Sequence, residues 1–205
     1  MKLSKGFYAI VLITFILLTD QAIKIWVKTH LFLYEDIYIT NWFHIHFIEN
    51  NGIAMGIKVT TTLLLSIFRI CASIGIVYYL YLLIKRNFKI GYIICISMIF
   101  AGTIGNIIDN IFYGIVFNNS TPQIVSILFP PRGYSTWLHG KVVDMFYFPL
   151  FKFILPAWIP FMGGNEFIFF RYIFNLADAS ISAGVITLLL FYQDSFSMSF
   201  EKKLS

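Results

Sequence analysis

The sequence has 205 residues, of which 59% are hydrophobic and only 12% are charged, against roughly 25% charged residues in a soluble globular domain. Aromatic residues make up 19% of the chain, which is more apolar surface than one water-soluble core can hide, so the composition excludes an ordinary soluble domain and favours a membrane protein. The net charge of +5 does not indicate nucleic-acid binding, because the basic residues lie in small clusters at the ends of apolar runs.

Four apolar stretches are each long enough to cross the hydrocarbon layer of a bilayer, which takes about 20 helical residues. They cover about residues 7–27, 62–84, 90–110 and 170–192. No small-residue cleavage site follows the first stretch, so we expect a retained helix rather than a removed signal peptide. The sequence therefore predicts an α-helical membrane fold with four transmembrane helices, in one domain over residues 1–205.

The basic residues predict how these helices are oriented. They cluster in three short segments that four spans would place on one side of the membrane: Lys2 and Lys5, then Lys85, Arg86 and Lys89, then Lys202 and Lys203. The positive-inside rule assigns that side, with both termini, to the cytoplasm. The connections at about residues 28–61 and 111–169 would then be long external loops.

The first connection alternates apolar and polar residues over 37–40 and 42–48, which predicts short strands in a small extracytoplasmic β-sheet. His44 and His46 alternate on the second strand and could bind a metal, but exposed polar positions on a strand are the favoured interpretation. No H-E-x-x-H zinc motif occurs, and we expect neither a metal nor another cofactor. The second connection holds all six prolines, so long helices are not expected there.

Ionisable residues inside apolar spans are costly and are candidates for function. Asp20 and Lys24 lie one helical turn apart, so they can neutralise each other as a structural ion pair or serve a site. Arg69 lies within the second span, where an inward-facing charge and a substrate contact are comparable alternatives. In the third span Asn106 and Asp109 share one helix face, which indicates either a polar packing seam or part of a site.

Two further carboxylates lie in apolar surroundings near the predicted external side. Asp144 lies inside the run Val142–Phe146, and Asp178 shares a helix face with Asn175 at the start of the fourth span. If two carboxylates converge where polarity is low, they tend to share one proton, as in aspartic peptidases. One of them then activates a water while the other polarises the scissile carbonyl.

These residues fall within five blocks that together resemble the lipoprotein signal peptidase (signal peptidase II) family, in the family's order. The blocks are Asp20-Gln21-x-x-Lys24, Asn50-Asn51-Gly52-Ile53-Ala54-Met55-Gly56, Gly102-x-x-Gly105-Asn106-x-x-Asp109, Gly140-Lys141-Val142-Val143-Asp144-Met145 and Phe174-Asn175-x-Ala177-Asp178. The resemblance implies an intramembrane aspartic endopeptidase that removes signal peptides from diacylglyceryl-modified prolipoproteins, cutting just before the lipidated cysteine.

The resemblance also implies roles for individual residues. Asp144 and Asp178 would be catalytic; Asn50, Gly52, Asn106 and Asn175 would bind or orient substrate; Asp20, Lys24 and Asp109 would be supporting residues. The expected partners are prolipoproteins and membrane lipids, with no nucleic acid. We expect a monomer in the bacterial inner membrane, with its active site facing the periplasm or cell exterior.

The chain departs from the family pattern in two ways. Asn110 stands where the family usually has arginine after the third-helix aspartate, which leaves the role of that charge open; Arg132, Lys141 and Arg171 are the candidates to supply it from elsewhere. The segments between Asp109 and Asp144 and from Phe146 to Arg171 are longer than is common. A small transporter or channel subunit, with its acidic residues spread through the membrane, and an inactive scaffold relative stay open as alternatives.

Overall fold

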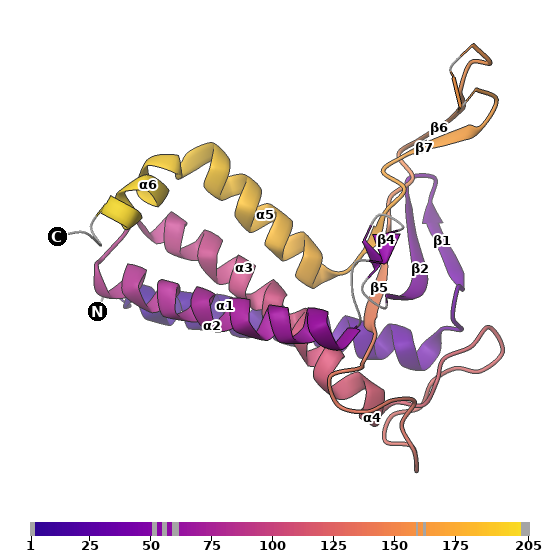
Figure 1. Cartoon of the computed structure of the whole chain (residues 1–205), viewed down its shortest axis with the longest axis horizontal. Helices are drawn as coiled ribbons and strands as arrows, with labels where there is room; N and C mark the ends of the chain where they lie inside the picture. The colour runs from indigo at the N-terminus through magenta and orange to yellow at the C-terminus, as the bar shows by residue number, and fades with distance from the viewer. Residues whose placement is uncertain are drawn as a thin grey trace.

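The computed structural model describes residues 3–50, 53–54, 57–58, 62–158, 160–161 and 163–201. Its long helices run side by side along the longest axis of the molecule, and its strands gather at one end (Figure 1). The start of the first helix and the last helix lie together at the opposite end.

Three helices are long and apolar enough to cross a membrane. They are α1 (Lys5–His30), α2 (Thr62–Lys85) and α3 (Ile90–Ile108), and α3 continues through a π-helical turn, η1 (Asp109–Tyr113), into α4 (Gly114–Val116). The first three predicted spans are therefore confirmed as helices. Their outward faces carry exposed apolar side chains such as Phe15 and Phe68, as expected of helices that are solvated by lipid.

The fourth span differs from its prediction. The helix α5 (Leu176–Phe191) starts about six residues later than expected, and a 90° bend separates it from α6 (Gln193–Glu201). The helices α5 and α6 form a fourth span only if the bent pair crosses together. The predicted start was wrong because a short apolar run is compatible with either a strand or a helix, and Ile173 and Phe174 pair with β5 as the strand β8.

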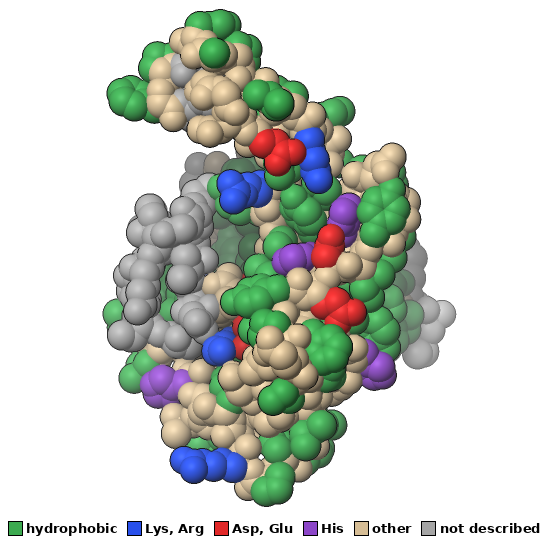
Figure 2. All heavy atoms as spheres, turned by 90° about the vertical axis from the view of Figure 1, so that its right-hand side faces the viewer, with side chains coloured by type: hydrophobic (Ala, Val, Ile, Leu, Met, Phe, Trp, Pro, Cys, Tyr) green, Lys and Arg blue, Asp and Glu red, His purple; other side chains and the backbone are tan. Residues whose placement is uncertain are grey.

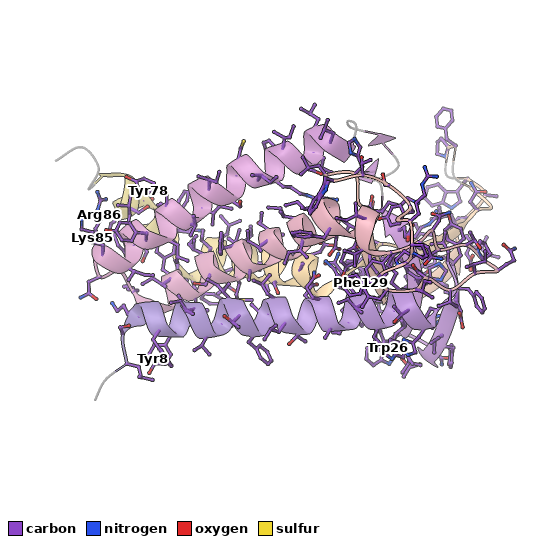
Figure 3. All side chains as sticks on the ribbon, turned by 90° about the horizontal axis from the view of Figure 1, so that it is seen from below. Tyr8, Trp26, Tyr78, Lys85, Arg86 and Phe129 are labelled. Carbon is purple, nitrogen blue, oxygen red and sulfur yellow. The ribbon has the colours of Figure 1, made fainter. Side chains whose placement is uncertain are left out.

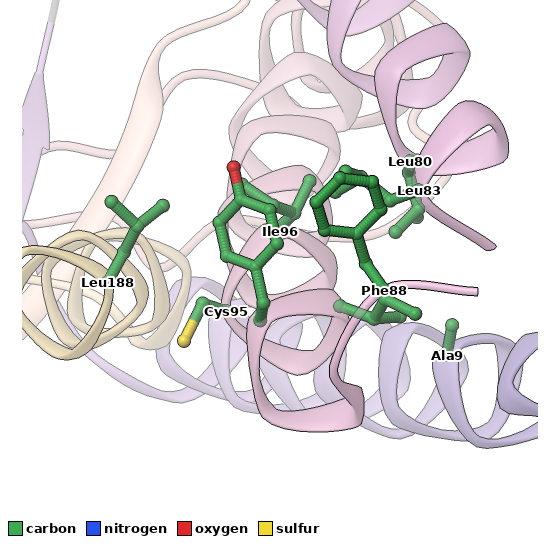
Figure 4. Close-up of a cluster of buried hydrophobic side chains, with 9 residues drawn as sticks. Ala9, Leu80, Leu83, Phe88, Cys95, Ile96 and Leu188 are labelled. Atoms are coloured by element: carbon green, nitrogen blue, oxygen red, sulfur yellow. The ribbon is translucent and has the colours of Figure 1, made fainter. Parts of the chain in front are cut away.

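The helix α3 is central, because it packs against α1, α2 and α5. A cluster of buried side chains from these helices surrounds it at the end away from the strands, including Ala9, Leu83, Phe88, Ile96 and Leu188 (Figure 4). The contact with α5 is especially close: a Cβ added at Gly102 would lie 2.2 Å from the carbonyl oxygen of Ala177. Only glycine allows the two backbones to approach in this way.

The strands form a four-stranded antiparallel sheet in the order β1-β2-β5-β8. Their bounds are β1 (Asp36–Thr40), β2 (Phe43–Asn50), β5 (Val142–Tyr147) and β8 (Ile173–Phe174). The two predicted strands correspond to β1 and β2, whereas β5 and β8 were not predicted. The sheet matters for the site because Asn50 ends β2, Asp144 lies within β5, and β8 leads directly into α5.

Two small hairpins complete the fold. One pairs β3 (Ile53–Ala54) with β4 (Ile57–Lys58), and the other pairs β6 (Phe151–Ile154) with β7 (Glu166–Phe169). The β6–β7 hairpin belongs to the long second connection and projects away from the sheet (Figure 1). It stands out from the surface at the sheet end, where charged and histidine side chains lie among hydrophobic ones (Figure 2).

The close contact between α3 and α5 predicts the effect of adding one methyl group. Gly102→Ala should lower the free energy of unfolding by roughly 1–3 kcal/mol, because the clash is with backbone and not with a flexible side chain. Gly75→Ala is the matched control, since nothing lies within 4 Å of a Cβ added there. Thermal unfolding in detergent measures both variants; equal midpoints for the two would contradict the described packing.

Candidate active site

The first turn of α5 holds Asp178 through a capping box. The side chain of Asn175 accepts a hydrogen bond from the Asp178 backbone N–H at 2.9 Å, and the Asp178 carboxylate accepts one from the Asn175 N–H at 3.4 Å. Such reciprocal bonds satisfy N–H groups that a helix start leaves unpaired. The motif Phe174-Asn175-x-Ala177-Asp178 thus both starts the helix and fixes the position of its carboxylate.

Asp144 lies in the middle of β5, and its side chain is buried. One carboxylate oxygen accepts a hydrogen bond from Asn175 Nδ2 at 2.7 Å, and the other accepts one from Asn50 Nδ2 at 3.3 Å. The register pairs Asn50 with Val142, two residues from Asp144. Because side chains two residues apart share a face of a sheet, pairing of β2 with β5 brings the amide to the carboxylate.

Asn106 of α3 completes a link between the two aspartates. Its Nδ2 donates to Asp178 Oδ1 at 2.8 Å, and its Oδ1 accepts from Asn175 Nδ2 at 3.1 Å. Two asparagines therefore connect Asp178 to Asp144 by hydrogen bonds. The structure gathers four of the residues singled out in the sequence, from three elements of the fold, around one point.

A buried ion cluster lies next to this link. Lys24 Nζ is 2.9 Å from Asp20 Oδ2 and 2.9 Å from Asp109 Oδ2, and it also donates to Asn106 Oδ1 at 3.0 Å. The pairing of Asp20 with Lys24 is confirmed, and Asp109 joins it. All three charged side chains are at most 1% exposed, so each depends on the others for charge compensation.

The two acids of the cluster also hold the elements that carry the aspartates. Asp20 Oδ1 accepts a hydrogen bond from the backbone N–H of Ala177 at 2.9 Å, one residue before Asp178. Asp109 Oδ2 accepts one from the N–H of Val143 at 3.3 Å, one residue before Asp144. One ion cluster therefore positions both halves of the site through the backbone.

The π-helical turn at the end of α3 brings Asp109 and Asn110 into the interior together, where both are buried. Asn110 exchanges two hydrogen bonds with Gly140: its Nδ2 donates to the Gly140 carbonyl at 2.8 Å, and the Gly140 N–H donates to its backbone carbonyl at 2.9 Å. A Cβ added at Gly140 would lie 2.0 Å from the Asp109 carbonyl oxygen. The glycine thus lets the chain enter β5 directly against α3.

The pKa of Asp144 is raised to about 7, mainly by burial and secondarily by the nearby charge of Asp178. A carboxyl group with such a pKa is largely protonated in mildly acidic solution, so the pair can hold a single proton. The arrangement can therefore present one protonated and one ionised carboxyl group to a bound water. Asp178 is only partly buried, which leaves the pair accessible from its side.

The structure gives other partners to two of the residues named as sources of charge. Lys141 pairs with Glu49 at 2.9 Å, and Arg171 lines a surface pocket with His46 and Tyr147. Arg69, which the sequence marked as a charge within an apolar span, donates from Nη1 to Asn110 Oδ1 at 2.6 Å.

A second buried ion pair anchors the long insertion. Lys28 of α1 pairs with Glu49 and donates to Ser120 Oγ at 3.0 Å. Burial alone would raise the pKa of Glu49, but Lys28 and Lys141 outweigh it and lower that pKa.

Gly52 lies outside the described residues. His44 and His46 both face Asp36, at 2.9 and 3.5 Å, and within the described ranges no group of three or more His, Cys, Asp or Glu could hold a metal ion.

The signal peptidase (SPase) II family matches residues 12–193. The chain belongs to this family. The lipoprotein signal peptidase of Porphyromonas gingivalis is 47% identical over 203 residues, which cover 98% of this chain and 90% of that protein. The lipoprotein signal peptidase of Amoebophilus asiaticus is 32% identical, covering 96% of this chain and 81% of that protein.

Solved structures of bacterial membrane enzymes share the fold. One superposes with a TM-score of 0.63 at 24% identity, covering 92% of this chain and 89% of the other. A second gives a TM-score of 0.59 at 23% identity, covering 91% and 94%. The apolar helices with small antiparallel sheets at one end are thus the fold of a multi-pass membrane enzyme.

The ion cluster predicts a strong dependence of stability on Lys24. Lys24→Met should lower the free energy of unfolding by about 3–5 kcal/mol, because it leaves two buried carboxylates without their cation. Lys85→Met is the matched control, since Lys85 is exposed at the end of α2. Thermal unfolding in detergent checks the prediction, which fails if Lys24→Met unfolds at the same temperature as the control.

The raised pKa of Asp144 predicts how stability changes with pH. Its ordinary pKa is 3.8 and its pKa in the folded protein is about 7, so between these values the folded state binds a proton that the unfolded state releases. Stability should therefore decrease as pH rises from about 4 to about 7. Unfolding midpoints measured across this range should fall more steeply for the parent than for Asp144→Asn; parallel slopes would refute the assignment.

Proposed function

We propose that this chain is an aspartic endopeptidase that removes the signal peptides of diacylglyceryl-modified prolipoproteins, cutting just before the lipidated cysteine. The observation that carries the proposal is the hydrogen-bonded link from Asp144 through Asn175 and Asn106 to Asp178. Membership of the signal peptidase II family and the relatives named lipoprotein signal peptidase support the substrate.

In the proposed reaction the two aspartates share one proton. Asp144 is the protonated member, because burial favours its neutral form, and it donates a hydrogen bond to the scissile carbonyl oxygen. Asp178 is the ionised member and takes a proton from the attacking water. Collapse of the tetrahedral intermediate then passes a proton to the leaving nitrogen, without a covalent acyl-enzyme.

The neighbouring polar residues have orienting roles in this proposal. Asn106 and Asn175 hold the carboxylates, and Asn50 holds Asp144 from β2. Gly52 is proposed to contact substrate on the resemblance alone. Asp20, Lys24 and Asp109 support the site through the backbone contacts described above and do not touch substrate.

The orientation in the membrane is part of the proposal. Lys85 and Arg86 lie at the end of the molecule opposite the sheet, as do Tyr8 and Tyr78, whereas Trp26 and Phe129 lie toward the sheet end (Figure 3). Basic residues favour the cytoplasmic side, so both termini would be cytoplasmic, and the sheet and long loops would be external. The aspartates would then face the periplasm or cell exterior from the bacterial inner membrane.

At that position the site matches the substrate. A diacylglyceryl chain holds the modified cysteine at the membrane surface, and carboxylates at the external end of the helices can reach the bond next to it. Membrane lipids are the other expected partner. We propose that one chain, as a single domain and without nucleic acid, metal or cofactor, carries the whole activity.

Cleavage of a diacylglyceryl-modified signal-peptide substrate by purified protein tests the function. Asp144→Asn and Asp178→Asn should each lower kcat by roughly 10²–10⁴-fold, the usual contribution of acid–base groups. Asp36→Asn, in the exposed edge strand β1, is the matched control and should retain activity. Activity should also fall as pH rises above about 7, where Asp144 loses its proton.

Two outcomes would contradict this proposal. One is a parent protein that cleaves nothing under conditions where a relative does so. The other is full activity in either folded aspartate variant, which would favour a transporter or scaffold role for the chain.

A further inference from the structure

Arg69 is a charged residue with no role in the reaction proposed above. It lies in the apolar helix α2, where an ionisable residue is costly to insert into the membrane. Its side chain is half-buried, and it interacts electrostatically with Asp178, Asp109 and Asp144. Its guanidinium contacts Asn110, the residue after Asp109, and so reaches the site from the α2 side.

Within the described part of the chain, Arg69 uses few of its hydrogen-bond donors. A guanidinium carries five N–H donors, and among the described residues its hydrogen bond is the one to Asn110 Oδ1. It forms no ion pair with a carboxylate in the part of the chain that the structure describes. Lys24, by contrast, is fully enclosed by Asp20, Asp109 and Asn106. A half-buried cation with free donors beside a reactive centre is suited to a ligand.

The proposed substrate needs such donors. A peptide must be extended at the bond to be cut, so its carbonyl groups there lose the partners that a helix would provide. In apolar surroundings each unpaired carbonyl costs several kcal/mol. The planar fork of a guanidinium can satisfy two oxygen atoms at once and holds its charge at any pH.

We propose that Arg69 is a substrate-binding residue, whose guanidinium donates hydrogen bonds to main-chain carbonyl oxygens of the signal peptide next to the scissile bond. Asn110 orients the guanidinium from η1 through the 2.6 Å hydrogen bond. This inference rests on the proposed peptidase function and adds a contact from a helix that supplies neither aspartate.

A purely structural role is the competing explanation, because the same hydrogen bond connects α2 to η1. Three variants separate the two roles. Arg69→Ala removes both the charge and this hydrogen bond, and Asn110→Ala removes the hydrogen bond but keeps the charge. Arg69→Ala with Asn110→Arg restores a guanidinium from η1 without restoring the hydrogen bond. Arg86→Ala, at the far end of α2, controls for the loss of an arginine.

The readouts are kcat and KM for the lipid-modified signal-peptide substrate, together with thermal unfolding. Arg69→Ala should lower kcat/KM by roughly 10- to 100-fold, the effect of losing a hydrogen bond from a charged group. The decrease in kcat/KM should be smaller for Asn110→Ala than for Arg69→Ala, even though Asn110→Ala also loses its hydrogen bond to Gly140. The double variant should recover part of the activity that Arg69→Ala loses. Arg86→Ala should match the parent.

The substrate-binding role is overturned if Arg69→Ala cleaves as well as the parent. It is also overturned if Asn110→Ala lowers kcat/KM as much as Arg69→Ala does and the double variant recovers no activity. The hydrogen bond between the two helical segments would then explain the whole effect. In an Asp144→Asn background, affinity for the uncleaved substrate should fall when Arg69 is replaced. Failure of the parent to cleave at all would instead refute the proposed function, so the two failures are distinguishable.

Discussion

The arrangement of the site depends on one buried cation. Lys24 balances Asp20 and Asp109 in an interior where none of the three is more than 1% exposed. Each acid also accepts a hydrogen bond from a backbone N–H next to a paired aspartate. Asp20 accepts from Ala177, which precedes Asp178, and Asp109 accepts from Val143, which precedes Asp144. Because an uncompensated charge could not be buried there, the cluster forces α1, α3, α5 and β5 to meet. Its contribution is positional, since ion clusters of this kind add little net stability compared with apolar packing.

The two aspartates are held by asparagines that each make more than one contact. Asn175 caps a helix, and its side-chain amide also holds Asp144, while Asn106 connects Asp178 to the lysine cluster. The close approach of α3 and α5 at Gly102 makes these short contacts possible. Burial of Asp144 and the nearby charge of Asp178 keep one carboxyl group neutral near pH 7, and that protonation state suits the proposed hydrolysis.

The differences from the family pattern lie around this centre and not within it. Asn110 stands where the family usually has an arginine, and the guanidinium of Arg69 on α2 contacts its side chain. The long insertion is held at its start by Lys28, which pairs with Glu49 and lies over the rings of Phe117 and Tyr134. These differences concern how charge and loops are attached to the site, whereas the hydrogen bonds between the aspartates and their asparagines lie at its centre.

The sequence by itself determined the membrane class, three of the helices, the strands β1 and β2, and the identity of the polar residues in the site. Hydropathy and alternation are local properties, so they can be read without knowing the neighbours. Only the tertiary structure decided that Asp144 lies in a strand, that α5 begins after Asn175, and that Arg69 faces the site. These features depend on partners far apart in the chain, such as Asn50 with Asp144 and Arg69 with Asn110. The free energy of a buried polar group is set by the group that meets it, and which groups meet is decided only when the helices and sheet have packed.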